Sequence, residues 1–151
     1  MPDSTRPRRW PAYTLTLVYL GYATGKAAYA LQARLGFPGG PPVSPTDTQS
    51  YPLDAATAQW LATASGLIGA CVALATVTPL AHKIPRTVML LALAGTLLAT
   101  GSGATIMIVD GFVGIGIGWQ WYHGVLGLVV ITLSAQTLRS YARATTTHTT
   151  H

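Results

Sequence analysis

The chain has 151 residues and a net charge of +5; half of its residues are hydrophobic and only 9% are charged. Its mean hydropathy is +0.40. Soluble domains carry about a quarter charged residues, so this composition argues against an ordinary soluble enzyme and indicates a lipid bilayer as the solvent. The positive charge does not indicate nucleic acid as a partner, because the basic residues flank apolar runs and form no single patch.

Four apolar runs are long enough to cross a hydrocarbon core of about 30 Å, which takes roughly 20 helical residues. They predict transmembrane helices over residues 12–33, 55–80, 87–109 and 112–138. Asp54 stands just before the second run and is a candidate N-cap. The expected fold is therefore all-α: a polytopic membrane protein with an antiparallel bundle of four transmembrane helices, in a single domain over residues 1–143.

The orientation of the bundle follows from its basic residues, because cytoplasmic segments of membrane proteins are enriched in Lys and Arg. One side of the predicted bundle carries Arg6, Arg8, Arg9, Lys83, Arg86, Arg139 and Arg143. The other side carries Asp47, Asp54 and Asp110, with Arg34 as its main basic exception. We therefore expect a multi-pass protein of the plasma (inner) membrane with both termini in the cytoplasm.

An alternative makes the first run a cleaved signal peptide, with "RPRR" as its basic region and "AYA" before the cut. The length of the run and the lysine inside it, Lys26, argue against this alternative. Residues 34–54 form the one long predicted loop, on the outer side, and their prolines and glycines favour a stiff connector over a lid or a docking loop. Residues 144–151 are of low complexity and are expected to be a disordered cytoplasmic tail.

The first run contains a charge that a bilayer does not easily accept. Lys26 lies on one helical stripe with Tyr22 and Tyr29. Because a charge at the bilayer centre costs a few kcal/mol, the ammonium group must either extend toward the outer end of the helix or pair with a carboxylate inside the bundle. Asp110 is the one carboxylate near the right depth, although its place at a short connection equally fits a turn or a cap.

Polar side chains also recur on single stripes of the second and fourth helices, with Gln59 on one and Gln120 and His123 on the other. If these stripes face one another, they line a polar cavity in the outer half of the bundle. The candidate cavity residues are then Tyr22, Lys26, Tyr29, Gln59, Asp110, Gln120 and His123. For His123 two interpretations stay open, a buried neutral side chain or a proton-relay or binding residue, and the surrounding "WQWYHG" also fits an aromatic belt.

No catalytic residue is assigned, and no metal or cofactor is expected, because the chain lacks HExxH, paired CxxC, phosphate-loop and dinucleotide-binding patterns. Small residues recur every four positions in two of the predicted helices, a spacing that lets membrane helices pack closely. The two stripes are Gly21, Gly25 and Ala28, and Gly95, Ala99 and Gly103.

The order "ARLGFPGGPP", then "AQWLATASGLIGACVALATV", then "KIPR", over about residues 21–93, resembles small four-helix integral membrane proteins of actinobacteria. The resemblance implies the fold and no activity. Three functions follow as hypotheses, in this order. The first is an accessory or structural membrane subunit, in contact with lipid and docked on its own copies or on a larger complex. The second is a carrier or channel with an outward-facing polar cavity. The third is an enzyme acting on a lipid or quinone-like substrate, with His123 as acid/base and Lys26 as an anion contact.

Overall fold

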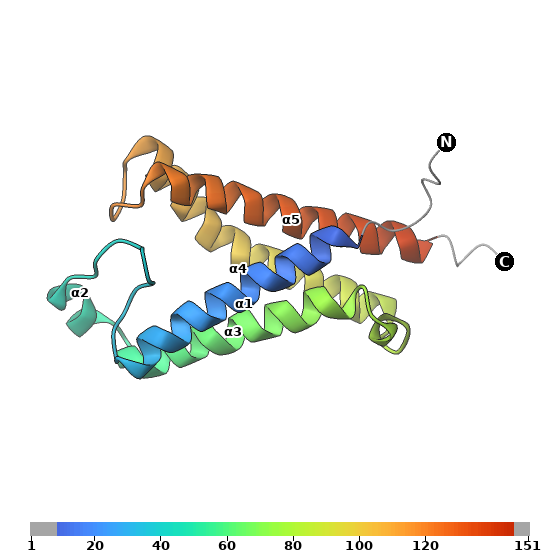
Figure 1. Ribbon diagram of the computed structural model, residues 1–151, viewed down its shortest axis with the longest axis horizontal. Coiled ribbons are helices and arrows are strands. Elements are labelled where there is room, and N and C mark those ends of the chain that lie inside the picture. Colours follow the sequence, from blue (N-terminus) through green and yellow to red (C-terminus); the bar gives the residue numbers. More distant parts are fainter. Residues whose placement is uncertain (1–8, 147–151) are drawn as a thin grey trace.

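Long helices joined by compact connections make up the fold, and the computed structural model describes residues 9–146 of the chain. Within this range there are five α-helices, one short 3-10 helix and no strand (Figure 1). The helices are α1 Trp10–Leu31, α2 Pro45–Ser50, α3 Ala55–Ala75, η1 Pro79–His82, α4 Arg86–Val113 and α5 Trp121–Thr146. The predicted all-α class is confirmed.

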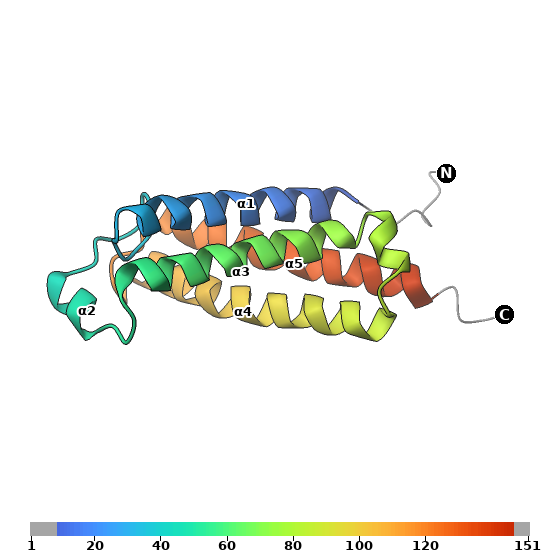
Figure 2. The same ribbon diagram turned by 90° about the horizontal axis from the view of Figure 1, so that it is seen from below.

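The four long helices form two antiparallel pairs. Helix α1 packs along α3, and α4 packs along α5, while fewer contacts join α1 to α5 and α3 to α4. Figure 1 shows the two pairs close together where α1 begins and α5 ends and diverging toward α2, and Figure 2 shows the same helices after a quarter turn. We call the first of these ends the terminal end; it carries Arg9, Lys83 and Arg143. The opposite one, the loop end, carries residues 32–54 and 114–120.

Local signals in the sequence explain where several helices begin and end. Asp54 caps α3 as expected, because its carboxylate accepts the backbone N–H of Thr57 at 3.0 Å. Hydrogen bonds from Thr57 also lower the pKa of Asp54 below its usual value. Ser44 caps the short helix α2 in the same way. At Gly114 the backbone turns to φ +75°, a conformation that favours glycine, and this residue ends α4.

Several helix boundaries differ from the predicted ones, and the largest difference concerns the fourth span, predicted over 112–138 and found over Trp121–Thr146. Helix α4 continues through Phe112 to Val113, and α5 begins only at Trp121. The glycine-rich residues 114–120 form the connection, because Gly114 and Gly118 take positive φ angles that a continuing helix does not allow. Likewise α3 ends at Ala75, ahead of the predicted residue 80, and the chain turns there into η1.

The remaining differences lie in the segments expected to have no regular structure. The outer loop contains the helix α2, which Ser44 begins and Tyr51 ends. Residues 144–146 of the predicted disordered tail belong to the last turn of α5, and residues 147–151 lie outside the described part of the chain.

Small residues facing aromatic rings bring the helices close together in the interior. A Cβ atom at Gly69 of α3 would lie 2.9 Å from the ring of Tyr19 on α1, so only glycine lets the ring pack there. The Tyr19 hydroxyl and Thr100 Oγ1 on α4 share a hydrogen bond of 2.7 Å, which links the two helix pairs. Two buried clusters surround these contacts: Leu15, Tyr19, Ala70, Ala73 and Leu133, and Ala75, Met89, Leu93 and Tyr141.

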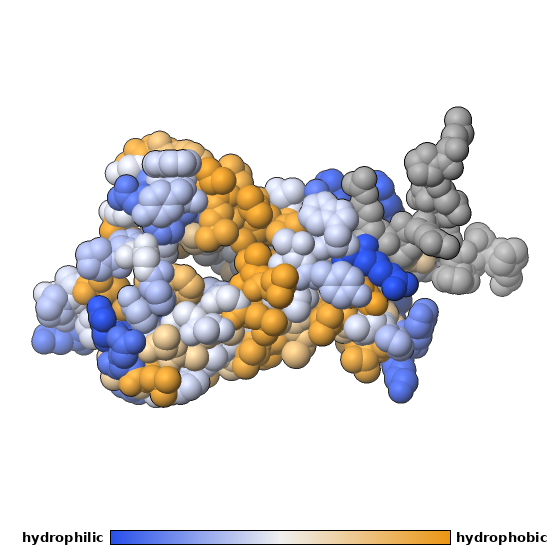
Figure 3. Space-filling model, viewed as in Figure 1, coloured by the Kyte–Doolittle hydropathy of each residue, from blue (hydrophilic) through white to orange (hydrophobic). Residues whose placement is uncertain are grey.

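The outer surface of the helices is apolar. Large hydrophobic side chains such as Leu17, Leu98 and Ile117 are about 70% exposed, and Figure 3 shows hydrophobic surface along the body of the molecule with hydrophilic residues gathered toward its ends. Exposed apolar surface of this extent marks an interaction with lipid or protein. Helices α3, α4 and α5 are long and apolar enough to cross a membrane, which indicates membrane association.

Candidate functional site

The loop that follows α1 folds back over the loop end of the helices and is held there by two side chains. Lys26 Nζ on α1 donates a hydrogen bond to the carbonyl oxygen of Gly36 at 2.9 Å. Gln59 Nε2 on α3 donates to the same oxygen, also at 2.9 Å, and to the carbonyl oxygen of Arg34 at 2.9 Å. A single carbonyl therefore accepts one hydrogen bond from each helix of the first pair.

Aromatic rings surround the Lys26 ammonium group. The rings of Tyr22 and Phe37 are stacked with centroids 5.9 Å apart, and Lys26 Nζ lies 5.6 Å and 5.9 Å from their respective centroids. Both distances are within reach of a cation–π attraction. Gly25 makes room for this arrangement, since a Cβ atom there would lie 2.5 Å from the Phe37 ring. The ammonium group is thus compensated by a carbonyl and two ring faces, and no carboxylate of residues 9–146 takes part.

Tyr29, the third member of the predicted stripe on α1, packs against the start of the same loop. Its ring centroid lies 5.2 Å from the guanidinium carbon of Arg34, and its ring is also close to Gly36. Gly36 itself has φ +106°, and Ala33 before it has φ +47°, so the chain reverses sharply after α1. Tyr22, Lys26 and Tyr29 therefore all serve to hold the loop.

On the second helix pair, Asp110 organises the connection between α4 and α5. Its side chain is 3% exposed, and Oδ2 accepts the backbone N–H groups of Gly118 and Trp119, each at 2.9 Å. Gly116 passes close to this carboxylate, since a Cβ atom there would lie 2.6 Å from it. Of the two alternatives for Asp110, the turn interpretation matches the structure; an ion pair with Lys26 does not form, because the two groups bind different segments.

His123 connects the second pair to the outer loop. Its Nδ1 accepts the backbone N–H of Gln120 at 3.1 Å, and its Nε2 lies 3.0 Å from the carbonyl oxygen of Gly39. Because a carbonyl can only accept, these two contacts fit the tautomer that carries its hydrogen on Nε2. Trp119 adds an apolar contact beside it, with its ring against Gly40. The Gln120 side chain is exposed and reaches only the carbonyl oxygen of Gly118, at 3.5 Å.

The predicted site residues are thus brought to one end of the molecule, in two groups that bind the loop at different residues. Lys26 and Gln59 bind the loop at Gly36, whereas His123 binds it three residues later at Gly39. Two cavities of the described part of the chain lie elsewhere, one in the core between Tyr19 and Ser134 and one along the outside of α1 and α5. The loop over residues 36–40, which we call the strap, joins the two helix pairs.

Several other polar residues on buried helix faces bind their own helices. Each of these hydroxyl groups donates to the carbonyl one turn earlier, at 2.8–2.9 Å: Thr16, Thr63, Ser134 and Thr137. Such back-bonding accounts for polar side chains on buried helix faces without any cavity. Gln59 Oε1 is the one buried side-chain oxygen or nitrogen of residues 9–146 that has no hydrogen-bond partner.

Sequence reasoning missed the strap residues themselves. Gly36, Phe37, Gly39 and Gly40 supply the carbonyls, the ring and the close contacts that the helices bind. The sequence "LGFPGG" does carry a signal for a tight structure, because glycines with positive φ mark turns where backbone and side chains approach closely. In residues 9–146, no three His, Cys, Asp or Glu side chains lie close enough to hold a metal ion.

Comparisons with protein family models, with curated proteins and with solved structures each find no match. The function proposed below is therefore argued from the geometry of the chain.

Proposed function

We propose that the chain is an accessory membrane subunit: a bundle of four transmembrane helices, with both termini in the cytoplasm, that associates through the outer face of α4. The helix lengths support the bundle, since even the 22-residue α1 extends about 33 Å at 1.5 Å per residue. The Lys26 ammonium group binds the strap near the loop end, away from the bilayer centre. The basic residues of the terminal end support the orientation.

The exposed face of α4 is the observation that carries the proposal. This helix has the highest mean hydropathy of the three candidate spans, 1.6, yet only 11% of its apolar window is buried, against 39% for α3 and 33% for α5. Gly95, Ala99 and Gly103 lie on its exposed side, and a Cβ atom at either glycine would meet no neighbour within 4 Å. Such small-residue faces allow close approach of a second membrane helix.

The partner that we propose for this face is α4 of a second copy. A stripe of small residues spaced by four is complementary to itself, so a two-fold related pair of α4 helices can bring both stripes into contact. The strap also supports the role of a structural subunit, because it binds both helix pairs and so holds them in one arrangement.

Cysteine crosslinking in membranes tests this function. The chain has a single cysteine, Cys71, and replacing it with alanine gives a background in which Ala99→Cys places a thiol on the proposed face. We expect a crosslinked dimer of the chain, which Gly95→Leu with Gly103→Leu abolishes. Gly101→Leu is the matched control, since this glycine lies on another side of α4 and also has an open neighbourhood. Crosslinking to a different protein, or none, contradicts the proposed partner.

One observation favours the carrier hypothesis as a second candidate. Figure 3 shows an opening between the two helix pairs beside the loop that arches over the loop end. If this opening admits solute, the strap is its outer cover, and releasing the strap must raise the flux of a small solute into vesicles that contain the protein. Lys26→Met with Gln59→Leu releases it from the first pair, and unchanged flux excludes the carrier.

A further inference from the structure

A groove runs along the outside of the molecule between α1 and α5, and no contact described above uses it. Its volume is about 350 Å³, which lies within the range of roughly 300–1,000 Å³ typical of small-molecule sites. Trp10 and Thr14 of α1 line one wall, and Leu128, Val129, Thr132 and Gln136 of α5 line the other.

The groove runs along the helix axes, the direction that an acyl chain takes beside a membrane helix. Because α5 rises about 1.5 Å per residue, its lining residues from Leu128 to Gln136 span about 12 Å along the helix axis. Val129 and Leu128 lie toward the loop end, and the groove opens sideways, since both side chains are about half exposed. An acyl chain that lies along the helices can therefore enter the groove from the surrounding bilayer.

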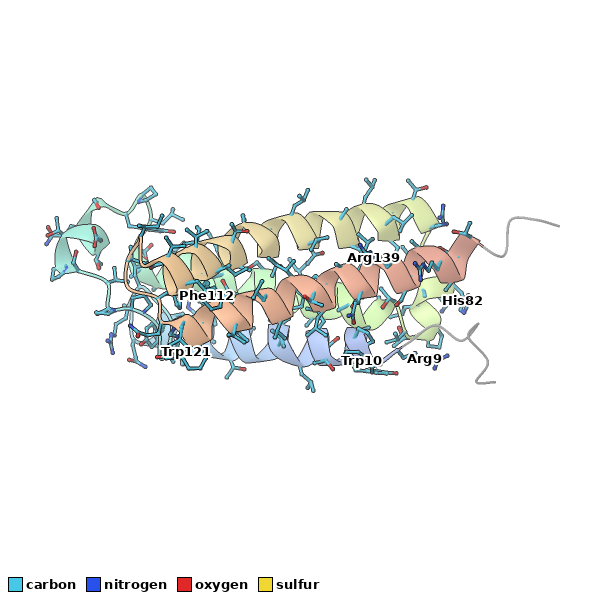
Figure 4. All side chains as sticks on the ribbon, turned by 90° about the horizontal axis from the view of Figure 1, so that it is seen from above. Arg9, Trp10, His82, Phe112, Trp121 and Arg139 are labelled. Atoms are coloured by element: carbon cyan, nitrogen blue, oxygen red, sulfur yellow. The ribbon has the colours of Figure 1, made fainter. Side chains whose placement is uncertain are left out.

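The groove leads to exposed cations at the terminal end. Arg139 and Arg143 continue the α5 stripe of Thr132 and Gln136, with steps of four, three and four residues, so they lie in line with the groove. Arg9 immediately precedes the groove residue Trp10, and Figure 4 shows Arg9, Trp10 and Arg139 in the half of the molecule opposite to Phe112 and Trp121, with Arg139 on the other side of α5 from Arg9 and Trp10 in this view.

No carboxylate in residues 9–146 neutralises these cations. The aspartates of this range, Asp47, Asp54 and Asp110, all lie at the loop end. Arg86, also at the terminal end, is different in that its guanidinium group donates to the hydroxyls of Thr145 and Thr146. The arginines in line with the groove can therefore donate hydrogen bonds to an anion outside the chain. In the proposed orientation, this end of the groove lies at a membrane surface.

We propose that this groove binds one anionic phospholipid of the cytoplasmic leaflet, with an acyl chain between α1 and α5 and the phosphate at Arg139 and Arg143. The site rests on the membrane orientation given under the proposed function, but not on the α4 face. Arginine suits the phosphate because its guanidinium group donates in pairs to phosphate oxygens. Trp10 lies at the depth where aromatic residues meet the headgroup region.

Native mass spectrometry of the full chain in detergent tests the proposal with two lipids of identical acyl chains, phosphatidylglycerol and phosphatidylcholine. We expect phosphatidylglycerol to bind more tightly. Arg139→Gln with Arg143→Gln should weaken its binding about thirtyfold, the loss expected for two basic side chains at a membrane surface, and should remove the preference. Lys83→Gln with Arg86→Gln removes the same charge at the same end without touching the groove and should leave the preference intact.

A second variant tests the acyl-chain part of the site. Val129→Trp places a bulky ring in the groove and should weaken the binding of both lipids, while glycerophosphoglycerol, which has the headgroup without chains, should not compete. Circular dichroism establishes that each variant keeps its helices. The proposal is overturned if the two lipids bind equally, if both charge pairs matter equally, or if the folded Val129→Trp protein still binds phosphatidylglycerol.

The outcomes separate this inference from the proposed function. If the chain shows no preference between the two lipids but does crosslink through α4, only the lipid site is overturned. If it prefers phosphatidylglycerol but does not crosslink through α4, only the α4 partner is overturned. A chain that does not fractionate with membranes overturns both.

Discussion

At the scale of single residues, one backbone carbonyl explains how the first apolar run accommodates the charge of Lys26. Gly36 accepts hydrogen bonds from Lys26 and from Gln59, and the stacked Tyr22 and Phe37 rings flank the ammonium group. Lys26 is half-buried, and taking part of an ammonium group out of water without such partners costs free energy, so the strap and the lysine stabilise each other. Lys26 is therefore best understood as a residue that holds a loop.

This role predicts the effect of removing the charge. Lys26→Met keeps a long unbranched side chain but loses a hydrogen bond from a charged group, worth about 1.5–3 kcal/mol. We expect the strap to open more often, so that trypsin cleaves after Arg34 at least about tenfold faster while the helix content stays the same. Lys83→Met, at the terminal end, is the control. Equal cleavage of the two variants would refute the role given to Lys26.

Single residues also show how much of the candidate site can be predicted from the sequence. Helical periodicity places Tyr22, Lys26 and Tyr29 on one stripe, for which a polar cavity is the expected surrounding; in the structure all three contact the loop that follows α1. The partner of Lys26 could not be predicted, because it is a backbone carbonyl whose position depends on the turns at Ala33 and Gly36. Any residue type offers such a carbonyl, so no side-chain pattern marks it.

At the scale of elements, glycines decide which helices pack closely and which face outward. Gly69 on α3 receives the Tyr19 ring, whereas Gly95 on α4 has an open neighbourhood. The two glycines look alike in the sequence, since each lies in an apolar helical run. Only the packing of the helices distinguishes an interior contact from a free face.

The same substitution should therefore have opposite effects at the two positions. Gly69→Ala places a Cβ atom 2.9 Å from the Tyr19 ring, and overpacking of this kind costs about 1–3 kcal/mol. Gly95→Ala meets no neighbour and gains the helix preference of alanine, about 0.5–1 kcal/mol. Thermal unfolding of the monomeric chain, at a detergent concentration that separates any dimer, should show a lower Tm for the first variant and an equal or higher Tm for the second. If only Gly95→Ala lowers the Tm, Gly95 and not Gly69 lies at a tight interior contact, which contradicts the packing described here.

The start of α5 shows a limit of reasoning about elements from sequence. Apolar residues continue through 112–117, so hydropathy alone extends the fourth span to Phe112. The structure ends α4 at Gly114 and lets the Asp110 carboxylate bind the N–H groups of Gly118 and Trp119. A hydrogen bond between residues eight or nine positions apart has no periodic signature, whereas the cap at Asp54 is local and was predictable.

At the scale of the whole molecule, an apolar body separates two ends of different chemistry. The terminal end carries most of the basic residues, and the loop end carries the aspartates, the strap, His123 and the two basic exceptions, Lys26 and Arg34. Composition and charge distribution are sufficient to predict this division, because both follow from the order of residues along the chain. The divergence of the two helix pairs and the groove between α1 and α5 depend on side-chain packing, which the sequence does not display.

Topology is the central claim on which the proposed function and the lipid site both rest, and thiol labelling in intact cells tests it most directly. In the Cys71→Ala background, Gln49→Cys places a thiol in α2 at the loop end, and Lys83→Cys places one at the terminal end; both positions are exposed. A membrane-impermeant maleimide should label Gln49→Cys in intact cells and Lys83→Cys only after the cells are permeabilised. The reverse pattern, or equal labelling of both thiols in intact cells, would contradict the account.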